Sequence, residues 1–431
     1  MLLSFSRLIK SIIEYIHTYD SNIDEGRGWM FKKILKSYDY SIVIVLALLI
    51  IFGLIMVYSA SMVSSVQRYG FESDYFYQKQ KINILISTVF FIVVALVPYK
   101  ILQSNKILIP MVIISLLGLG GLFVFGHVAG NAQSWFKIGA SSLQPSEFVK
   151  LCVIIYLSAV YAKKQTYINE FNKGVVPPLA YLVLVLLLVA IQPDIGTAAI
   201  ILLIASTIVL SSGMSYRNIL KLGGIGLALV IPFILITADK LFSDVRMGRI
   251  QAFQNPFVDE QGYGWQLANS YIALGTGGIK GLGLGQSVQK LGYLPESHTD
   301  FIMAVIAEEL GIFGVVFVLL CLGYIVLKGI YIGMKCNDAF GSLMAIGISS
   351  MVGIQSFINL GGISGVIPLT GVPLPFVSYG GSSLLQLSIS MGILVNISMF
   401  VNYEKNYKGT ETKNRQEPAK PFVRKKYSFR K

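Results

Sequence analysis

The sequence predicts an all-α protein that crosses a membrane about ten times. Hydrophobic residues make up 54% of the 431 residues and charged residues 13%, roughly half the charged fraction of a soluble domain. The mean hydropathy is +0.67, and the apolar runs are about 17–25 residues long, the length that a bilayer-spanning helix needs. The runs lack strict alternation of polar and apolar residues, which favours helices over a β-barrel.

Ten apolar runs are expected to form transmembrane helices. They lie at 41–61, 82–98, 107–126, 146–162, 176–193, 194–212, 219–238, 301–333, 340–360 and 381–402. A tight turn at Gln192-Pro193-Asp194 is all that separates the fifth run from the sixth. Together the runs define a membrane domain over 41–402, in which a large outer loop, 239–300, separates the seventh span from the eighth.

The distribution of basic residues predicts that both termini are cytoplasmic, because loops rich in lysine and arginine stay inside. The segment 1–40 and the tail 403–431 are both basic, and the tail is polar enough to predict disorder. Apolar residues at helical spacing from Phe5 to Ile16 predict a short helix on the membrane surface, with a frayed tail as the alternative. The net charge of +13 suits an anionic inner leaflet and requires no nucleic acid.

Two features argue against cofactor chemistry of the usual soluble kinds. The glycine-rich run 275–285 resembles a phosphate-binding loop, but it follows no predicted strand and faces the outside, so no nucleotide is expected. The three cysteines, Cys152, Cys321 and Cys336, have no spacing typical of a metal site or a disulfide framework.

Two carboxylates and a histidine lie together where the eighth span begins. Glu296, His298, Thr299 and Asp300 directly precede the apolar run. A carboxylate beside an apolar phase is poorly solvated, which raises its pKa and makes it a better base. His298 could tune this pair or carry a proton. The alternative is that Thr299 or Asp300 caps the following helix, which would tend to lower the carboxyl pKa.

Ionisable residues at membrane depth form a second set of candidates. Gln192 and Asp194 lie in the turn between two spans, where Asp194 is either a functional residue or the N-cap of the next helix. Ser146 is expected to N-cap the fourth span. Glu147 and Lys150, three residues apart, share a helix face that should point to the protein interior or a polar cavity. The alternative for this pair is an internal ion pair that orients helices.

Further candidates lie in the outer loops. Arg246 and Arg249 could bind a phosphate through their guanidinium forks, although a helix resting on lipid headgroups explains them equally well. The uncharged stretch from Pro368 to Ser383, which includes Ser378 and Ser382, predicts a re-entrant loop lining a cavity or a packed plug.

Six motifs follow one another along the chain. They are Trp135 with Gln144-Pro145-Ser146-Glu147, Gln192-Pro193-Asp194-Ile195-Gly196, Gly262-Tyr263-Gly264-Trp265-Gln266, Gly281-Leu282-Gly283-Leu284-Gly285, Leu294-Pro295-Glu296 with His298-Thr299-Asp300-Phe301, and Pro373-Leu374-Pro375-Phe376 with Ser378-Tyr379-Gly380-Gly381-Ser382-Ser383. In this order, over about 40–402, they resemble the SEDS family of peptidoglycan glycosyltransferases, which includes the FtsW, RodA and SpoVE proteins.

The resemblance implies an enzyme that polymerises lipid II, the undecaprenyl-pyrophosphate-linked disaccharide-pentapeptide, on the outer face of the bacterial cytoplasmic membrane. It implies a class B penicillin-binding protein transpeptidase and other divisome membrane proteins as partners. It also implies a divalent cation, magnesium or manganese, although the sequence shows no ligand set. Segments 367–373 and 70–77 are similar to the division type of low-GC Gram-positive bacteria, which implies septal wall synthesis.

Residue by residue, the resemblance makes Asp300 the essential aspartate, Trp135 a tryptophan important for activity, and Glu147 with Lys150 the buried charged pair. Asp300 would then deprotonate the acceptor hydroxyl in a single inverting displacement. The other candidates are assigned to substrate binding: Trp135, Glu147, Lys150, Gln192, Asp194, Arg246, Arg249, Glu296, His298, Thr299, Ser378 and Ser382. A lipid II flippase and a scaffold for the transpeptidase are the rival functions, and the outward position of most candidates favours the enzyme.

Overall fold

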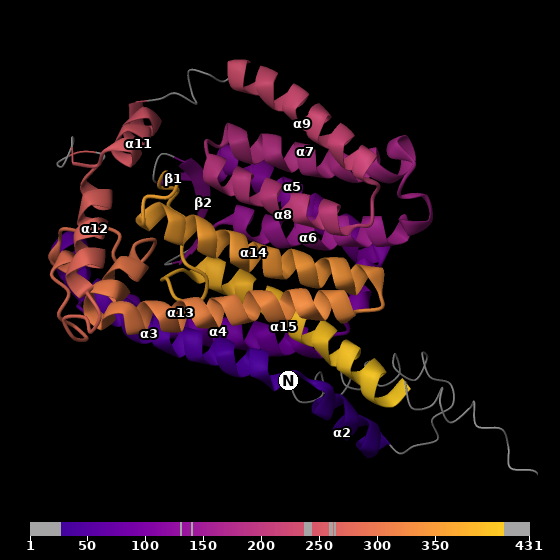
Figure 1. The fold of residues 1–431 in the computed structure, drawn as a ribbon, viewed down its shortest axis with the longest axis horizontal. Helices are drawn as coiled ribbons and strands as arrows, with labels where there is room; N and C mark the ends of the chain where they lie inside the picture. Colours follow the sequence, from indigo (N-terminus) through magenta and orange to yellow (C-terminus); the bar gives the residue numbers. More distant parts are fainter. Residues whose placement is uncertain are drawn as a thin grey trace, which may run out of the picture.

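The computed structural model describes residues 27–129, 132–138, 141–236, 244–257, 262 and 264–408. The expected surface helix near Phe5–Ile16 and most of the C-terminal tail lie outside these residues. Figure 1 shows long helices running side by side, with α2 and the end of α15 at one end of the bundle and α11 and α12 at the other. Helix α2 and the end of α15 therefore lie opposite α11 and α12.

Each expected span corresponds to one helix. These helices are α3 (Tyr40–Tyr69), α4 (Tyr75–Leu96), α5 (Asn105–Phe125), α6 (Pro145–Lys163), α7 (Val176–Ile191), α8 (Ile195–Ser211), α9 (Tyr216–Ile236), α13 (Ile302–Lys335), α14 (Ala339–Ile363) and α15 (Gly381–Tyr403). Among the described residues, seven helices are long and apolar enough to cross a membrane, namely α3, α4, α5, α6, α13, α14 and α15. Helices α7 and α8 are apolar but shorter.

Short elements precede, connect and follow these helices. They are α2 (Arg27–Ser37), α11 (Asp244–Gln254), α12 (Trp265–Gly277), the 3-10 turns η1 (Tyr99–Gln103), η2 (Gln165–Tyr167) and η4 (Gln289–Leu291), and the π turns η3 (Phe171–Val175) and η5 (Glu404–Lys408). The expectation of disorder from 403 onwards is wrong for its first residues, because α15 and η5 keep the chain helical to Lys408.

A small antiparallel sheet between α5 and α6 was not predicted. Its strands β1 (His127–Ala129), β2 (Ala132–Ile138) and β3 (Ser141–Leu143) pair in sequence order. His127 pairs with Trp135, and Phe136 pairs with Leu143. Strands β1 and β3 have three residues each, and the seven residues of β2 do not alternate between polar and apolar, which explains why the sequence pattern gave no signal.

The protein core is formed around three central helices, α6, α14 and α15, which are buried over most of their length. Helix α15 packs against α4, and α14 packs against α13, α8 and α6. The outer helices keep large apolar side chains exposed, for example Leu85 of α4 and Ile114 and Leu117 of α5. In a bilayer such side chains face lipid, so their exposure fits membrane-spanning helices.

The eighth span is broken near its start. Gly311 has a φ of +62° inside α13, so a short buried segment at 302–310 precedes the long straight part. At this break the glycine-rich run lies directly against α13: the amides of Leu282 and Gly283 donate to the carbonyls of Glu308 and Glu309, each at 2.9 Å. A Cβ on Gly281 would lie 2.2 Å from the Glu309 carbonyl oxygen. These glycines thus permit close contact between two backbone segments, which differs from the use of glycine in a phosphate loop.

Candidate active site

Asp300 lies in the loop that leads into α13. The helix begins at Ile302 with Phe301 as its N-cap residue, and no side chain caps it. The alternative that Thr299 or Asp300 caps this helix is therefore wrong. The carboxyl group of Asp300 instead receives a hydrogen bond from the Thr299 hydroxyl at 3.1 Å.

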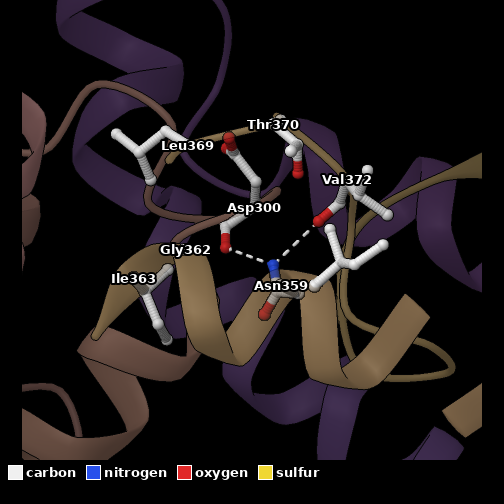
Figure 2. A pocket seen from close by; sticks show the side chains of 9 residues that line it. Asp300, Asn359, Gly362, Ile363, Leu369, Thr370 and Val372 are labelled. Atoms are coloured by element: carbon white, nitrogen blue, oxygen red, sulfur yellow. Dashed lines mark hydrogen bonds between the residues drawn. The ribbon is translucent and has the colours of Figure 1, made fainter. Parts of the chain in front are cut away.

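The Asp300 side chain borders a small pocket of about 180 Å³ between α14 and the loop that follows it. Asn359 of α14 donates both to the Asp300 carbonyl at 2.7 Å and to the Val372 carbonyl at 2.8 Å. Figure 2 shows these two bonds below the Asp300 side chain, whose carboxyl points away from Asn359 between Leu369 and Thr370. Asn359 thus joins the loop carrying Asp300 to the loop after α14.

The surroundings of Asp300 make it a strong base for a carboxylate. Burial raises its pKa to about 7, and the negative charge of Glu296 acts in the same direction. The Thr299 hydrogen bond and the positive charge of Arg249 on α11 act in the opposite direction. A carboxylate with a pKa near the working pH is well suited to accept a proton from a sugar hydroxyl.

Glu296 lies on the solvent side of Asp300. Its carboxylate pairs with Arg68 at 3.2 Å and lies 2.9 Å from the Thr299 hydroxyl oxygen, which can donate its one hydrogen either to Glu296 or to Asp300. Arg68 also donates to the Pro295 carbonyl at 3.1 Å, so the C-terminal end of α3 contacts the loop at two points.

His298 is enclosed by aromatic rings. Its ring centroid lies 4.4 Å from that of Phe76 and 5.7 Å from that of Tyr379. Burial lowers its pKa to about 4, so the imidazole is neutral at pH 7. Its carbonyl accepts from the Tyr379 amide at 2.9 Å. These contacts favour a packing role over proton transfer.

A second group of charges lies on α6 and at the start of α8. Lys150 donates to Glu147 at 2.8 Å, and both side chains are buried. Asp194 is the N-cap of α8 and accepts from the Thr197 amide at 3.1 Å, as the capping alternative predicted. Asp194 is close enough to Lys150 and Glu147 for their charges to act on it. The Gln144 amide reaches toward Asp194 at 3.5 Å and connects it to the start of α6.

The predicted N-cap residue of α6 is wrong. Gln144 rather than Ser146 is its N-cap residue, and Pro145 occupies the first turn. Proline suits this position because its missing N–H would have no helical partner there. Ser146 is consequently buried one residue further inside the helix.

The loop after α14 is re-entrant. A Cβ on Gly53, near the middle of α3, would lie 2.8 Å from the Val377 Cα, so the loop packs deep against this helix. Ser378 accepts from the Leu374 amide at 2.8 Å and stabilises the turn. Ser382 at the start of α15 donates to the Ser142 carbonyl at 3.1 Å, which holds β3 against α15.

This loop separates the two charged groups. Thr370 lines the Asp300 pocket on one side. On the other side its Cβ lies 3.6 Å from where a Cβ on Gly196 would be, two residues after Asp194. The structure therefore brings Glu296, Thr299 and Asp300 together, and it brings Glu147, Lys150 and Asp194 together on the far side of the loop.

The other predicted candidates take separate positions. Gln192 donates to the Leu119 carbonyl at 2.7 Å and ties α7 to α5. Trp135 lies on β2, which contacts α5 and α6. Arg246 and Arg249 lie on α11, where the predicted amphipathic stretch is helical, and Arg249 is close enough to influence Asp300. The side chain of Arg246 is outside the described part of the chain.

Sequence reasoning missed two residues of the site, Arg68 and Asn359. Asn359 was detectable, because a polar side chain near the end of an apolar span is a functional candidate. Arg68 was not, since α3 continues to Tyr69, well beyond the expected end of its span at 61. Within the described residues, no cluster of three or more His, Cys, Asp or Glu side chains could hold a metal ion.

Comparison with known proteins identifies relatives over most of the chain. The family model for the FtsW, RodA and SpoVE group, described as "Cell cycle protein", matches residues 39–403. The probable peptidoglycan glycosyltransferase FtsW of Bacillus subtilis is 56% identical over 405 residues, which cover 93% of this chain and 99% of that protein. Stage V sporulation protein E of Bacillus subtilis is 38% identical over 370 residues, 85% of this chain and 98% of that protein.

Solved structures share the fold. One of them, from work on "Structural coordination of polymerization and crosslinking by a peptidoglycan synthase complex", matches with a TM-score of 0.67 at 24% identity and covers 84% of this chain and 98% of that chain. The rod shape determining protein RodA of Thermus thermophilus matches with a TM-score of 0.60 at 23% identity and covers 84% of this chain and 96% of that chain. The family match, the identity to its members and the shared fold confirm the resemblance, and the chain belongs to the FtsW/RodA/SpoVE family.

Proposed function

We propose that this protein is a peptidoglycan glycosyltransferase that polymerises lipid II into glycan strands. The observation that carries the proposal is Asp300, a carboxylate with a raised pKa that points into a pocket beside a re-entrant loop. Family membership and the 56% identity to a probable peptidoglycan glycosyltransferase support the reaction class.

In the proposed reaction, Asp300 removes the proton from the 4-hydroxyl of the acceptor GlcNAc. The oxygen attacks the anomeric carbon of the donor MurNAc, the glycosidic bond to pyrophosphate breaks, and undecaprenyl pyrophosphate leaves. One displacement inverts the anomeric centre and needs no covalent enzyme intermediate. Arg249, whose charge already acts on Asp300, would stabilise the developing charge of the leaving pyrophosphate.

The size of the pocket limits how substrate can bind. The roughly 180 Å³ includes space open to solvent, and the part that the centre of a water molecule can occupy is about 10 Å³, room for about one water. Binding of a disaccharide is therefore expected to displace the 369–372 segment, whose connection to Asp300 runs through Asn359. The same displacement would give substrate access to Glu147, Lys150 and Asp194 beyond Thr370.

We also propose the cellular setting that the resemblance implies. Asp300 and the 239–300 loop would face outward, because the distribution of basic residues predicts that both termini are cytoplasmic. A class B penicillin-binding protein would crosslink the strands, together with other divisome membrane proteins at the septum. The similarity to FtsW proteins supports the septal location over elongation or sporulation.

A divalent cation, magnesium or manganese, remains a proposal from the family resemblance. Magnesium is usually held by waters and substrate phosphates with few protein carboxylates, so the lipid pyrophosphate would bring most of its ligands. Loss of polymerisation on chelation, and its return with added magnesium or manganese, would support this requirement.

The test of the reaction uses the full chain purified in detergent with its penicillin-binding partner, whose transpeptidase site is inactivated. We expect glycan strands from purified lipid II. A flippase only moves lipid II between leaflets and a scaffold only recruits its partner, so neither would produce glycan strands. Absence of strands in the presence of a divalent cation would refute the glycosyltransferase proposal in favour of these two functions.

A further inference from the structure

Three residues form a continuous polar chain from the pocket to the surface. The Thr299 hydroxyl oxygen lies 3.1 Å from Asp300 Oδ1, 2.9 Å from Glu296 Oε2 and 3.2 Å from the Glu296 carbonyl oxygen, so the bond to the Glu296 carboxylate is the shortest of the three. A threonine hydroxyl carries one hydrogen, so it donates to one carboxylate at a time. It can accept from the other carboxylate only when that group carries a proton. The geometry therefore suits two carboxylates that share a single proton.

The outer end of this chain is held in place and reaches water. Arg68 pairs with Glu296 at 3.2 Å, and the side chains of Arg68 and Glu296 are 50% and 34% exposed. Arg68 also bonds the carbonyl of Pro295, which fixes the backbone before Glu296. Glu296 thus contacts solvent, whereas Asp300 faces the pocket that substrate would fill.

We propose that Glu296 is the proton outlet of Asp300, with Thr299 as the bridge and Arg68 as the anchor. This inference rests on the proposed function. After Asp300 has taken the proton from the acceptor hydroxyl, its O–H donates to the Thr299 oxygen while the Thr299 O–H donates to Glu296. Transfer of both protons along these bonds leaves Asp300 ionised, Thr299 unchanged and Glu296 protonated. Glu296 then releases the proton to water, and the site is ready for the next sugar.

The negative charge of Glu296 acts directly on Asp300, so the two carboxylates are coupled. Protonation of Glu296 removes the negative charge next to Asp300 and so helps Asp300 stay ionised, as in any coupled pair. Arg68 and Tyr69 of α3 face Glu296, and Arg249 of α11 acts on Asp300. His298, the neighbouring titratable group, is enclosed by Phe76 and Tyr379 and offers no comparable route to water.

Thr299→Val tests the bridge, since valine has nearly the shape of threonine without its hydroxyl. Lipid II polymerisation by the full chain with its transpeptidase-inactive partner should slow about 10-fold or more in kcat, with KM for lipid II changed by less than about twofold. Thr299→Ser restores a hydroxyl and should recover most of the lost rate. Thr276→Val is the matched control, because the Thr276 hydroxyl bonds only carbonyls of its own helix α12 in the described structure.

Chemical rescue separates proton transfer from a merely structural role. Small buffers such as imidazole should accelerate Thr299→Val and Glu296→Gln, because they carry the proton in place of the missing groups, and should leave the wild type unchanged. The proposal is overturned by a Thr299→Val variant as fast as Thr276→Val. It is equally overturned by a slow Thr299→Val variant that neither serine nor buffer restores.

Asp300→Asn distinguishes this inference from the function on which it rests. An inactive Asp300→Asn beside a fully active Thr299→Val would remove the outlet and keep Asp300 as the base. A fully active Asp300→Asn would remove the base and the outlet together.

Discussion

Replacement of Lys150 by methionine should destabilise the membrane domain strongly. Lys150 lies 2.8 Å from Glu147, and their side chains are 1% and 7% exposed. The second carboxylate oxygen of Glu147 is buried with no hydrogen-bond partner among the described residues. Lys150→Met would therefore leave a carboxylate in the protein interior without its cation.

Removal of one partner from a buried ion pair costs about 3–5 kcal/mol, which is a factor of about 100 to 4,000 in the unfolding equilibrium. The double variant Glu147→Gln with Lys150→Met removes both charges of the pair and leaves only Asp194, which the Thr197 amide at the start of α8 still stabilises. It should regain more than half of the lost free energy, because two neutral side chains are less costly to bury than one lone charge.

The assay is unfolding of the purified proteins in detergent, followed by tryptophan fluorescence, for the wild type, both variants and Lys163→Met. Lys163 lies at the exposed end of α6 and bonds Asn105, so its loss should cost less than about 1 kcal/mol. A Lys150→Met variant as stable as Lys163→Met would refute the assignment of a buried pair. So would a double variant less stable than the single one.

Three further predictions concern the site and its supports. Because Asp300 must be ionised to accept a proton, kcat/KM for lipid II should rise with pH, with a midpoint at about 7. Glu296→Gln removes a like charge and should move this midpoint to lower pH. An unmoved midpoint would exclude Glu296 as a cause of the raised Asp300 pKa. Gly281→Ala should reduce the yield of folded protein, measured by size-exclusion chromatography, because Gly281 has a φ of +75° and a Cβ there would clash with α13. Gly275→Ala, where a Cβ would meet open space, should be neutral or stabilising in the same assay. Asn359→Leu should lose about 2–4 kcal/mol of stability and most activity, because two buried carbonyls lose their donor; unchanged melting and turnover would contradict its joining role.

The positions of the helices were predictable because spanning a bilayer requires a long apolar run. Their ends were less predictable. The α3 helix continues to Tyr69 because the sequence after 61 is polar enough for water yet still helix-forming, and hydropathy reports membrane depth rather than helix length. The break at Gly311 was also invisible, since a glycine in an apolar run reads as part of the helix until its partner backbone is seen.

The site was predictable in its residue types and only partly in its grouping. Asp300, Glu296 and Thr299 are neighbours in sequence, so their proximity follows directly. Glu147 and Asp194 come from different helices, and their placement near each other depends on packing that a single sequence does not specify. The same holds for Arg68 and its contact with Glu296 across 228 positions.

The most direct test of the central claim compares lipid II polymerisation by the wild type and by Asp300→Asn, each co-purified with its transpeptidase-inactive partner. Glu72→Gln serves as control, since Glu72 is an exposed acid in the α3–α4 loop. Our account predicts strands from the wild type and Glu72→Gln and none from a well-folded Asp300→Asn. Strands from Asp300→Asn at the wild-type rate would contradict it.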